Sequence, residues 1–191
     1  MTTTSISRSP SHPIAALRSI YIARFVFALA WGLVLIASKP QLGSLLTTLL
    51  VIYPLVDAGA VYWQRRSEGR TSAPRVSETV NVAVSVVVAI AVGVASTMSI
   101  AAALGVWGVW AVASGATQLA TAVQRRSAGG QVPQMLSGGI SVLAGLSFLA
   151  SALRGADSIA DVGGYALLGG IFFLVSAVRL SMTPRKPGAL S

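Results

Sequence analysis

Long uncharged stretches, each bounded by basic or acidic residues, constrain this chain more than any other feature. Between Glu78 and Arg125, 46 consecutive residues (79–124) carry no formal charge. A membrane-spanning helix needs about 20 predominantly apolar residues. The stretch is therefore too long for one span and has the length of two, and we expect the break between them in the segment Ser-Thr-Met-Ser at 96–99.

The same criterion applied to the whole chain predicts an all-α membrane protein with six transmembrane helices. Only 10% of the residues are charged, against about 25% in soluble domains, which excludes an ordinary water-soluble fold. The predicted six-helix domain covers 13–182, between a flexible cytoplasmic tail at 1–12 and a second cytoplasmic tail at 183–191. The predicted spans are 19–38, 42–63, 78–97, 100–124, 133–153 and 162–180.

The basic residues predict the orientation of these spans. Twelve of the fourteen lysines and arginines fall on one side of the predicted spans, and Lys39 and Arg154 fall on the other. Because lysine and arginine accumulate in cytoplasmic loops, we expect a multi-pass protein with both termini in the cytoplasm and with anionic lipids near that face. The net charge of +9 does not indicate nucleic-acid binding, because the basic residues are spread between apolar runs and form no single patch.

Two sequence patterns indicate an internal repeat. In each odd-numbered span a glycine precedes a serine by six residues, and Gln-Arg-Arg-Ser occurs at both 64–67 and 124–127. The pattern predicts three parallel helical-hairpin repeats, because a unit with two spans returns the chain to its starting side. The alternative is a chance coincidence among abundant small residues. The glycine and serine pairs are Gly32 with Ser38, Gly93 with Ser99, and Gly145 with Ser151.

Several of these elements resemble a known family. The segment Ala-Trp-Gly-Leu at 30–33, the turn at Lys39-Pro40, the Asp-Ala-Gly element at 57–59 and the repeated short hairpins are similar to the HdeD-type family. Its members are small six-span bacterial inner-membrane proteins associated with acid resistance. The resemblance implies a bacterial inner (plasma) membrane location and a role in envelope or acid stress. It defines no catalytic residues that can be transferred to this chain.

Arg24 and Asp57 are the two ionisable residues expected inside spans. Such groups are costly in a membrane and are functional candidates by default. Counted from Arg18 and from Arg65, both lie about 9–12 Å inside the cytoplasmic boundary at a rise of about 1.5 Å per residue, so we expect them to pair. The alternative is that Arg24 extends to the lipid headgroups while Asp57 packs in its protonated form.

The fourth span carries a polar stripe at helical spacing, which we expect to face other helices or a water-filled cavity, because lipid would leave its polar groups unsatisfied. Interhelical hydrogen bonds that hold the bundle together are the alternative to a functional role. The stripe contains Trp107, Trp110, Ser114 and Thr121, together with Thr117 and Gln118. The expected polar cluster in the cytoplasmic half combines Arg24, Asp57, Asn81, Ser85, Thr117 and Gln118.

Enzyme chemistry finds little support in the sequence. The chain has no cysteine, and its one histidine, His12, lies in the predicted N-terminal tail. Neither a metal site nor a Ser-His catalytic pair can be assembled from these residues. We therefore expect no catalytic residues, no metal and no cofactor.

These observations leave two functions open. The first is a non-enzymatic membrane protein of the cell envelope with a structural, stress-related or partner-binding role, with another membrane protein or a second copy of the chain as its partner. The second is a small channel or transporter with a proton or small-solute pathway past Arg24, Asp57 and Gln118. A conduit requires a polar cavity that reaches both faces, whereas small residues close a structural bundle by tight packing.

Overall fold

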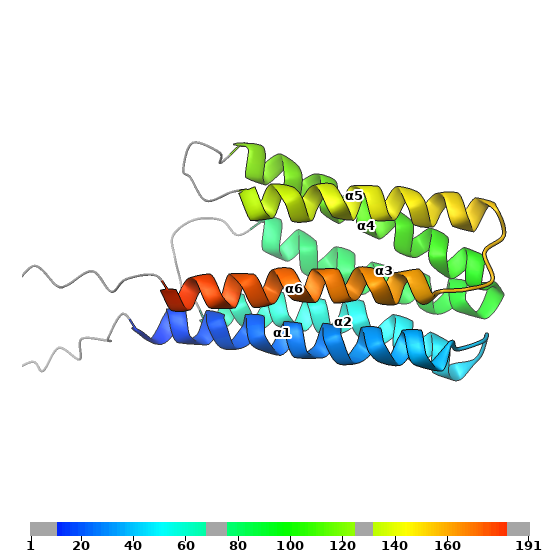
Figure 1. The fold of residues 1–191 in the computed structure, drawn as a ribbon, viewed down its shortest axis with the longest axis horizontal. Helices are drawn as coiled ribbons and strands as arrows, with labels where there is room; N and C mark the ends of the chain where they lie inside the picture. Colours follow the sequence, from blue (N-terminus) through cyan, green and yellow to red (C-terminus); the bar gives the residue numbers. More distant parts are fainter. Residues whose placement is uncertain (1–10, 68–75, 125–131, 183–191) are drawn as a thin grey trace, which may run out of the picture.

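The computed structural model describes residues 11–67, 76–124 and 132–182, and every regular element within these ranges is an α-helix. All six helices are long and apolar enough to cross a membrane. The predicted all-α fold with six spans is thus confirmed for the described residues (Figure 1). The helices are α1 (Ser11–Ser38), α2 (Ser44–Ser67), α3 (Val76–Met98), α4 (Ile100–Gln124), α5 (Val132–Leu153) and α6 (Ala160–Met182).

Helix α1 begins earlier than the sequence suggested. The 1–12 segment was expected to be a tail, but Ser11 and His12 are already helical. The prediction put the start of the helix at Pro13, because proline favours the first helical position, and the observed helix begins two residues before it. The expected tails at 1–10 and 183–191 lie outside the described residues.

Short turns with defined backbone geometry connect the helices at one end of the bundle. After α1, Lys39 adopts a left-handed φ of 42°, a conformation common just past a helix C-terminus. After α5, Gly155 adopts φ 74°, and the Ala156 and Gly155 amides donate to the Ser151 and Ala152 carbonyls, which is a Schellman ending. Ser99 alone separates α3 from α4, and its hydroxyl caps α4 by accepting a bond from the Ala102 amide.

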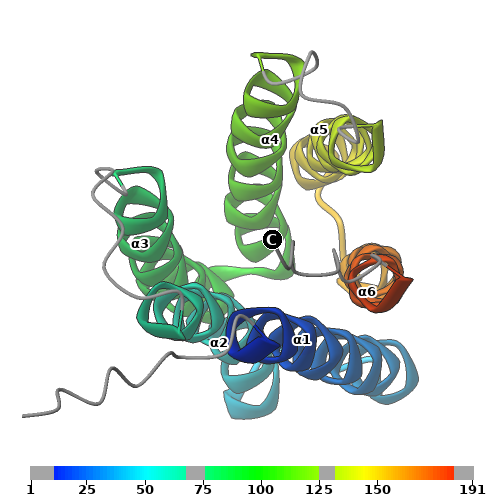
Figure 2. The same ribbon diagram turned by 90° about the vertical axis from the view of Figure 1, so that its left-hand side faces the viewer.

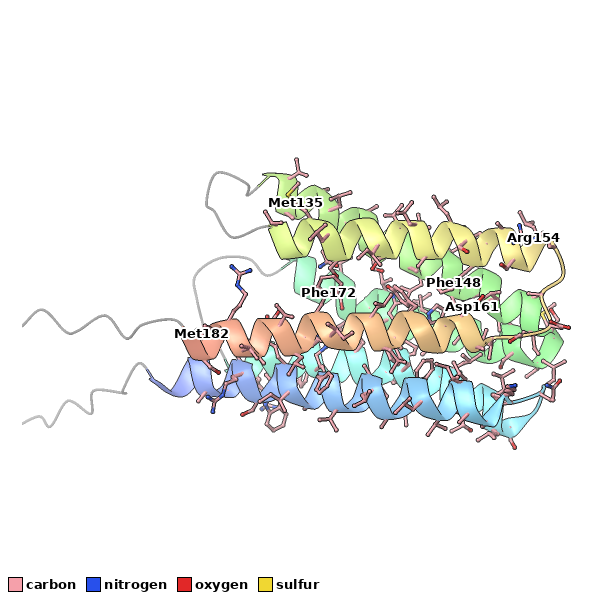
Figure 3. All side chains as sticks on the ribbon, viewed as in Figure 1. Met135, Phe148, Arg154, Asp161, Phe172 and Met182 are labelled. Atoms are coloured by element: carbon pink, nitrogen blue, oxygen red, sulfur yellow. The ribbon has the colours of Figure 1, made fainter. Side chains whose placement is uncertain are left out.

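The two ends of the bundle differ in what they carry. The N/C end is the end at which α1 begins and α6 ends. Figure 3 places Met182 at the N/C end and Arg154 and Asp161 at the opposite end. Seen from the N/C end, the helices follow one another around a ring in chain order, and α3 and α4 diverge toward the viewer (Figure 2).

Contacts around this ring alternate between extensive and slight. Helix α4 packs extensively on α5, α1 on α6, and α2 on α3, whereas the pairs α1–α2, α3–α4 and α5–α6 touch less. The extensive contacts therefore join consecutive predicted hairpins rather than the two helices of one hairpin. Helices α4 and α5 therefore form a close pair that touches its neighbours α3 and α6 less.

Glycines explain why α4 and α5 pack so closely. A Cβ placed on Gly108 would lie 2.9 Å from the Gly145 carbonyl oxygen, and one on Gly115 would lie 2.7 Å from that of Gly138. The two contacts are seven residues apart on each helix, so the backbones meet at two successive positions along the same faces. Small residues at such contacts allow close van der Waals packing without a hydrophobic driving force.

Large buried side chains concentrate in the half of the bundle opposite the N/C end. The main apolar cluster draws on the last turns of α1, α3 and α5 and the first turns of α2, α4 and α6. Toward the N/C end the buried apolar residues are mostly alanines, such as Ala58, Ala122 and Ala177. The opposite half is therefore closed by bulky packing. Its largest deeply buried members are Leu35, Leu46, Leu50, Val92, Leu104, Trp107 and Val162, each no more than 1% exposed.

Two adjacent glycines of α5 provide a test of the close contact between α4 and α5. Gly138→Ala would put a methyl group 2.8 Å from the Gly115 carbonyl oxygen, whereas a Cβ at Gly139 meets nothing within 4 Å. We expect Gly138→Ala to lower the free energy of unfolding by about 1–3 kcal/mol, the usual cost of overpacking. Gly139→Ala should leave it unchanged or raise it slightly. Denaturant titration in detergent measures both, and equal effects would contradict this packing.

Candidate functional site

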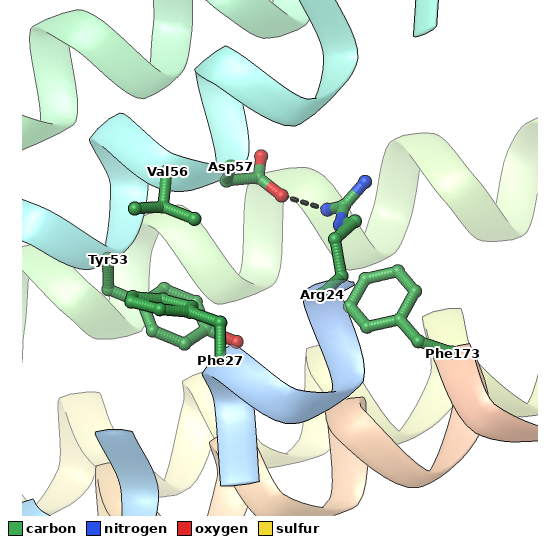
Figure 4. A pocket seen from close by; sticks show the side chains of 6 residues that line it. All are labelled: Arg24, Phe27, Tyr53, Val56, Asp57 and Phe173. Atoms are coloured by element: carbon green, nitrogen blue, oxygen red, sulfur yellow. Dashed lines mark hydrogen bonds and ion pairs between the residues drawn. The ribbon is translucent and has the colours of Figure 1, made fainter. Parts of the chain in front are cut away.

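Arg24 of α1 and Asp57 of α2 meet inside the bundle, in the half near the N/C end. The guanidinium Nη2 of Arg24 donates a hydrogen bond to Oδ1 of Asp57, and the two groups form an ion pair (Figure 4). Each side chain is only 16% exposed. The predicted pairing of these two residues is confirmed.

The pair also involves two further helices. Ser85 of α3 is fully buried, and its hydroxyl donates a 3.3 Å bond to the other carboxylate oxygen of Asp57. On the opposite side, Cζ of Arg24 lies 4.1 Å from the ring centroid of Phe173 on α6, a cation–π contact. One pair of charges therefore connects α1, α2, α3 and α6.

A small cavity borders the ion pair. Its volume is about 20 Å³, which is room for about one water molecule. Figure 4 shows the second terminal nitrogen of Arg24 directed away from Asp57. The cavity is lined by Arg24, Phe27, Tyr53, Val56, Asp57 and Phe173.

An aromatic cluster lies between the ion pair and the closed half of the bundle. The Tyr53 ring lies 4.6 Å from Trp31 and 5.6 Å from Trp107, and Trp107 meets Trp110 edge-on at 5.4 Å between centroids. The indole N–H of Trp31 donates to the Leu49 carbonyl at 2.7 Å. The indole nitrogen of Trp107 is buried and has no hydrogen-bond partner among the described residues. The aromatic rings thus separate the charged layer from the aliphatic core.

A second hollow opens at the opposite end of the bundle. It has a volume of about 560 Å³ and lies between the start of α2 and the end of α3. Its polar lining consists of hydroxyl groups, including those of Thr47 and Ser96, which bond to each other at 2.8 Å. The two hollows share no lining residue.

The remaining members of the predicted polar cluster are not all at the pair. The Asn81 and Thr117 side chains are exposed, and the Thr117 hydroxyl donates to the Ala113 carbonyl of its own helix. Gln118 is half-buried, and the structure gives no hydrogen bond between it and the pair. Of the polar residues predicted near the pair, Ser85 is the one that bonds to it. The predicted cluster was too large, because residues at the same depth in the membrane can lie on helix faces that point in different directions.

The stripe predicted on α4 is buried only along its first part. Trp107 and Trp110 lie in the core, as expected for a face directed at other helices. Ser114 is half-buried, and its hydroxyl donates to the Trp110 carbonyl at 2.7 Å. The Thr121 side chain lies outside the described part of the structure. The Ser114 hydroxyl therefore bonds within its own helix, and this contact supports neither the interhelical hydrogen bonds nor the functional role considered for the stripe.

Sequence reasoning missed three aromatic members of the site. Tyr53 lies four residues before Asp57, and Phe27 lies three after Arg24, so helical spacing already puts each on the face of its charged neighbour. Phe173 has no comparable signal, because its place at the site depends on how α6 packs on α1. A polar contact between α5 and α6 was also missed: the Tyr165 hydroxyl donates to the Ser141 hydroxyl at 2.9 Å.

The chemistry available at the site is limited to one carboxyl group and one guanidinium group. The guanidinium keeps its proton under all ordinary conditions, whereas a carboxylate can accept one. No group of three or more potential metal ligands occurs among the described residues. The pair can therefore hold helices together, bind an acceptor through free guanidinium N–H groups, and take up a proton at Asp57.

Comparison with known proteins gives no assignment. No family model, curated protein or solved structure matches the chain.

Removing one member of the ion pair is expected to cost more stability than removing both. Arg24→Gln or Asp57→Asn alone leaves a charge without its partner in a poorly hydrated place. Such losses reach about 3–5 kcal/mol for fully buried pairs, and the 16% exposure here makes that range an upper bound. The double variant, with both charges removed, should recover most of the loss in a denaturant titration.

Arg154 and Asp161 provide matched controls, because both are exposed at the opposite end of the bundle. Arg154→Gln and Asp161→Asn should each change the free energy of unfolding by no more than about 0.5 kcal/mol. If the effects of Arg24→Gln and Asp57→Asn simply add in the double variant, the two side chains are not energetically coupled.

Proposed function

We propose that this chain is a non-enzymatic integral membrane protein of the cell envelope, with a structural, stress-related or partner-binding role in the bacterial inner membrane. The main support is the closure of the half opposite the N/C end. There, aromatic and aliphatic side chains exposed by no more than 1% fill the centre of the bundle. A bundle closed in this way holds its helices in place and leaves no open path through the described residues.

The positions of the charges support an orientation with the N/C end in the cytoplasm. Arg18, Arg66 and Arg179 are exposed near this end, and the basic residues between the second and third spans belong to the same side. Lysine and arginine mark the cytoplasmic side of membrane proteins. This orientation puts the ion pair in the cytoplasmic half, where anionic lipids at the surface would contact the basic side chains.

The close helix contacts support an origin from three parallel hairpins. The repeated glycine of each odd helix packs against the even helix that precedes it around the ring. A Cβ on Gly32 would meet the Gly163 carbonyl at 2.9 Å, one on Gly93 the Val51 side chain at 3.2 Å, and one on Gly145 the Gly108 carbonyl at 2.7 Å. Equivalent contacts at all three interfaces are what a threefold repeat of one hairpin would produce.

The resemblance to the HdeD-type family supports the stress-related part of this proposal. Acid stress lowers the cytoplasmic pH. In the proposed orientation, the half-buried carboxyl group of Asp57 lies in the cytoplasmic half of the bundle. Protonation of Asp57 would break the ion pair that connects α1, α2, α3 and α6. These four helices would then lose one of the contacts that join them in the half near the N/C end.

A small channel or transporter is the second candidate. One observation favours it: an ionisable pair beside a cavity, inside a membrane-spanning bundle, is typical of proton or ion pathways. The closed opposite half weighs against a continuous path in this conformation. A conduit would need α4 and α5 to move away from the other helices and open the core.

Proton flux into liposomes separates the two candidates. Proteoliposomes with a trapped pH-sensitive dye should acidify no faster than protein-free liposomes when a pH gradient and a membrane potential are imposed. The closed core is the physical reason, because protons cannot cross it along a chain of polar groups. Flux that is well above the lipid background and is lost in Asp57→Asn would favour the conduit.

The partner-binding role needs a separate measurement. Native mass spectrometry after extraction in mild detergent should find the 19.6 kDa chain in a complex with a second copy or with another membrane protein. A chain that is always monomeric, with no flux and no partner, would leave only the structural role.

A further inference from the structure

We propose that the Arg24–Asp57 site binds one small monovalent anion together with one proton. The anion would be of the size of chloride or formate and would bind to Arg24, while the proton would bind to the Asp57 carboxylate. This inference concerns binding alone, so it does not depend on the structural, partner-binding or conduit role considered above.

The charged side chains inside the bundle balance each other. Arg24 and Asp57 are the partly buried members of the described charged side chains, and all the others are exposed. The interior described by the structure thus contains one positive and one negative group, with a net charge of zero. The exposed charged residues are Arg18, Lys39, Arg66, Arg154, Asp157, Asp161 and Arg179.

Such a site should bind only those combinations of ions that keep its net charge at zero. An isolated charge in a poorly hydrated interior costs several kcal/mol, by order of magnitude, after all relaxation. An anion that bound alone would leave the site with a net charge of −1, and a proton that bound alone would leave it at +1. When both bind, the site stays neutral, so the two should enter together.

The guanidinium group has donors to spare for an anion. Arginine has five N–H donors, and the hydrogen bond that the structure gives for Arg24 runs from Nη2 to Asp57. The other terminal nitrogen points away from the carboxylate (Figure 4). Inside a membrane protein, guanidinium donors need an acceptor, and a water molecule or an anion would provide one.

The size of the cavity limits the anion. About 20 Å³ beside Arg24 and Asp57 holds one water-sized group, which suits chloride. Formate, with three heavy atoms, would also need the room that the carboxylate vacates when the ion pair breaks. The lining side chains Phe27, Val56 and Phe173 are apolar and offer no hydrogen bonds to a large polyhydroxylated anion. Gluconate should therefore not bind.

The groups around Asp57 leave its carboxylate as the site of proton uptake. Tyr53 on α2 and Tyr165 on α6 are the other titratable groups near it, and a phenol, with a pKa of about 10 in water, stays neutral between pH 4 and about 7. Helix α3 contributes the Ser85 hydroxyl, and α4 and α5 contribute the indole groups of Trp107 and Trp110 and the hydroxyl of Ser141 to the interior. None of these groups titrates in that range.

The exchange balances in charge and in bonds. A proton from water binds the Asp57 carboxylate and forms a neutral carboxylic acid, which breaks the ion pair with Arg24. The anion then takes the place of the carboxylate as the acceptor on the guanidinium. The net charge of the site is zero before and after, and no oxidation or covalent step is involved.

Proton uptake on addition of salt tests this coupling. Purified protein in a nonionic detergent is placed in very weak buffer near pH 5, and sodium chloride or sodium formate is added while a pH dye is recorded. We expect saturable uptake approaching one proton per chain, with no uptake from sodium gluconate. Because the anion binds together with one proton, its Kd should rise as the pH rises.

Variants test which side chain binds the anion and which binds the proton. Asp57→Asn should bind chloride without proton uptake and with a Kd that no longer depends on pH. Arg24→Gln should lose binding, and the double variant, which keeps the interior neutral and should fold, should lose it as well. The exposed controls Asp161→Asn and Arg154→Gln should behave like the wild type.

Three results would overturn the proposal. They are the absence of saturable chloride or formate binding in the wild-type protein, saturable binding without proton uptake, and wild-type binding in the folded double variant. The liposome flux and the mass of the native complex are measured independently. A failure here is therefore distinguishable from a failure of the proposed function.

Discussion

The fold depends most on one interaction, the ion pair between Arg24 and Asp57 in a surrounding that hydrates charges poorly. Neither charge could remain inside the bundle without the other. Their pairing fixes α1 against α2, the Ser85 hydroxyl adds α3, and Phe173 adds α6 through its ring. The ion pair and its two neighbours thus connect four helices in the half near the N/C end. The helices left out, α4 and α5, are held to each other by glycine contacts instead.

Two kinds of packing divide the bundle along its length. Opposite the N/C end, leucine, valine and tryptophan side chains fill the centre. Near the N/C end, alanines and the charged layer take their place, and α3 and α4 diverge (Figure 2). The packed core thus lies between the charged layer near the N/C end and the hollow at the opposite end. That arrangement explains why a binding site is a better interpretation of the charged layer than an open channel.

Simple physical rules predict much of this structure from the sequence. Span length and charge are enough for the six helices, and the break between α3 and α4 falls at Ser99, inside the expected segment. Counting residues from the basic boundaries gives Arg24 and Asp57 the same depth, and their pairing follows from the cost of isolated charges. These features depend on local composition and on one strong energetic rule.

Such rules do not predict features that depend on how each helix is rotated and packed against its neighbours. Asn81 and Thr117 have suitable depth but are exposed, since depth does not determine which face of a helix meets its neighbours. Phe173 reaches Arg24 only because α6 packs closely on α1. The extensive contacts between consecutive hairpins likewise depend on small residues that meet across helices, and a single sequence does not reveal which glycines will be opposite each other.

Thiol accessibility tests most directly the claim that a packed core separates the charged layer from the opposite end of the bundle. The chain contains no cysteine, so an introduced cysteine is the only reactive thiol. Val56→Cys lies at the cavity beside the ion pair, and Ala103→Cys lies in the closed core, fully buried. In sealed vesicles of both orientations, a small membrane-impermeant thiol reagent should label Val56→Cys only from the side of the chain termini and should not label Ala103→Cys. Labelling of Ala103→Cys, or labelling of Val56→Cys from the other side, would contradict the account.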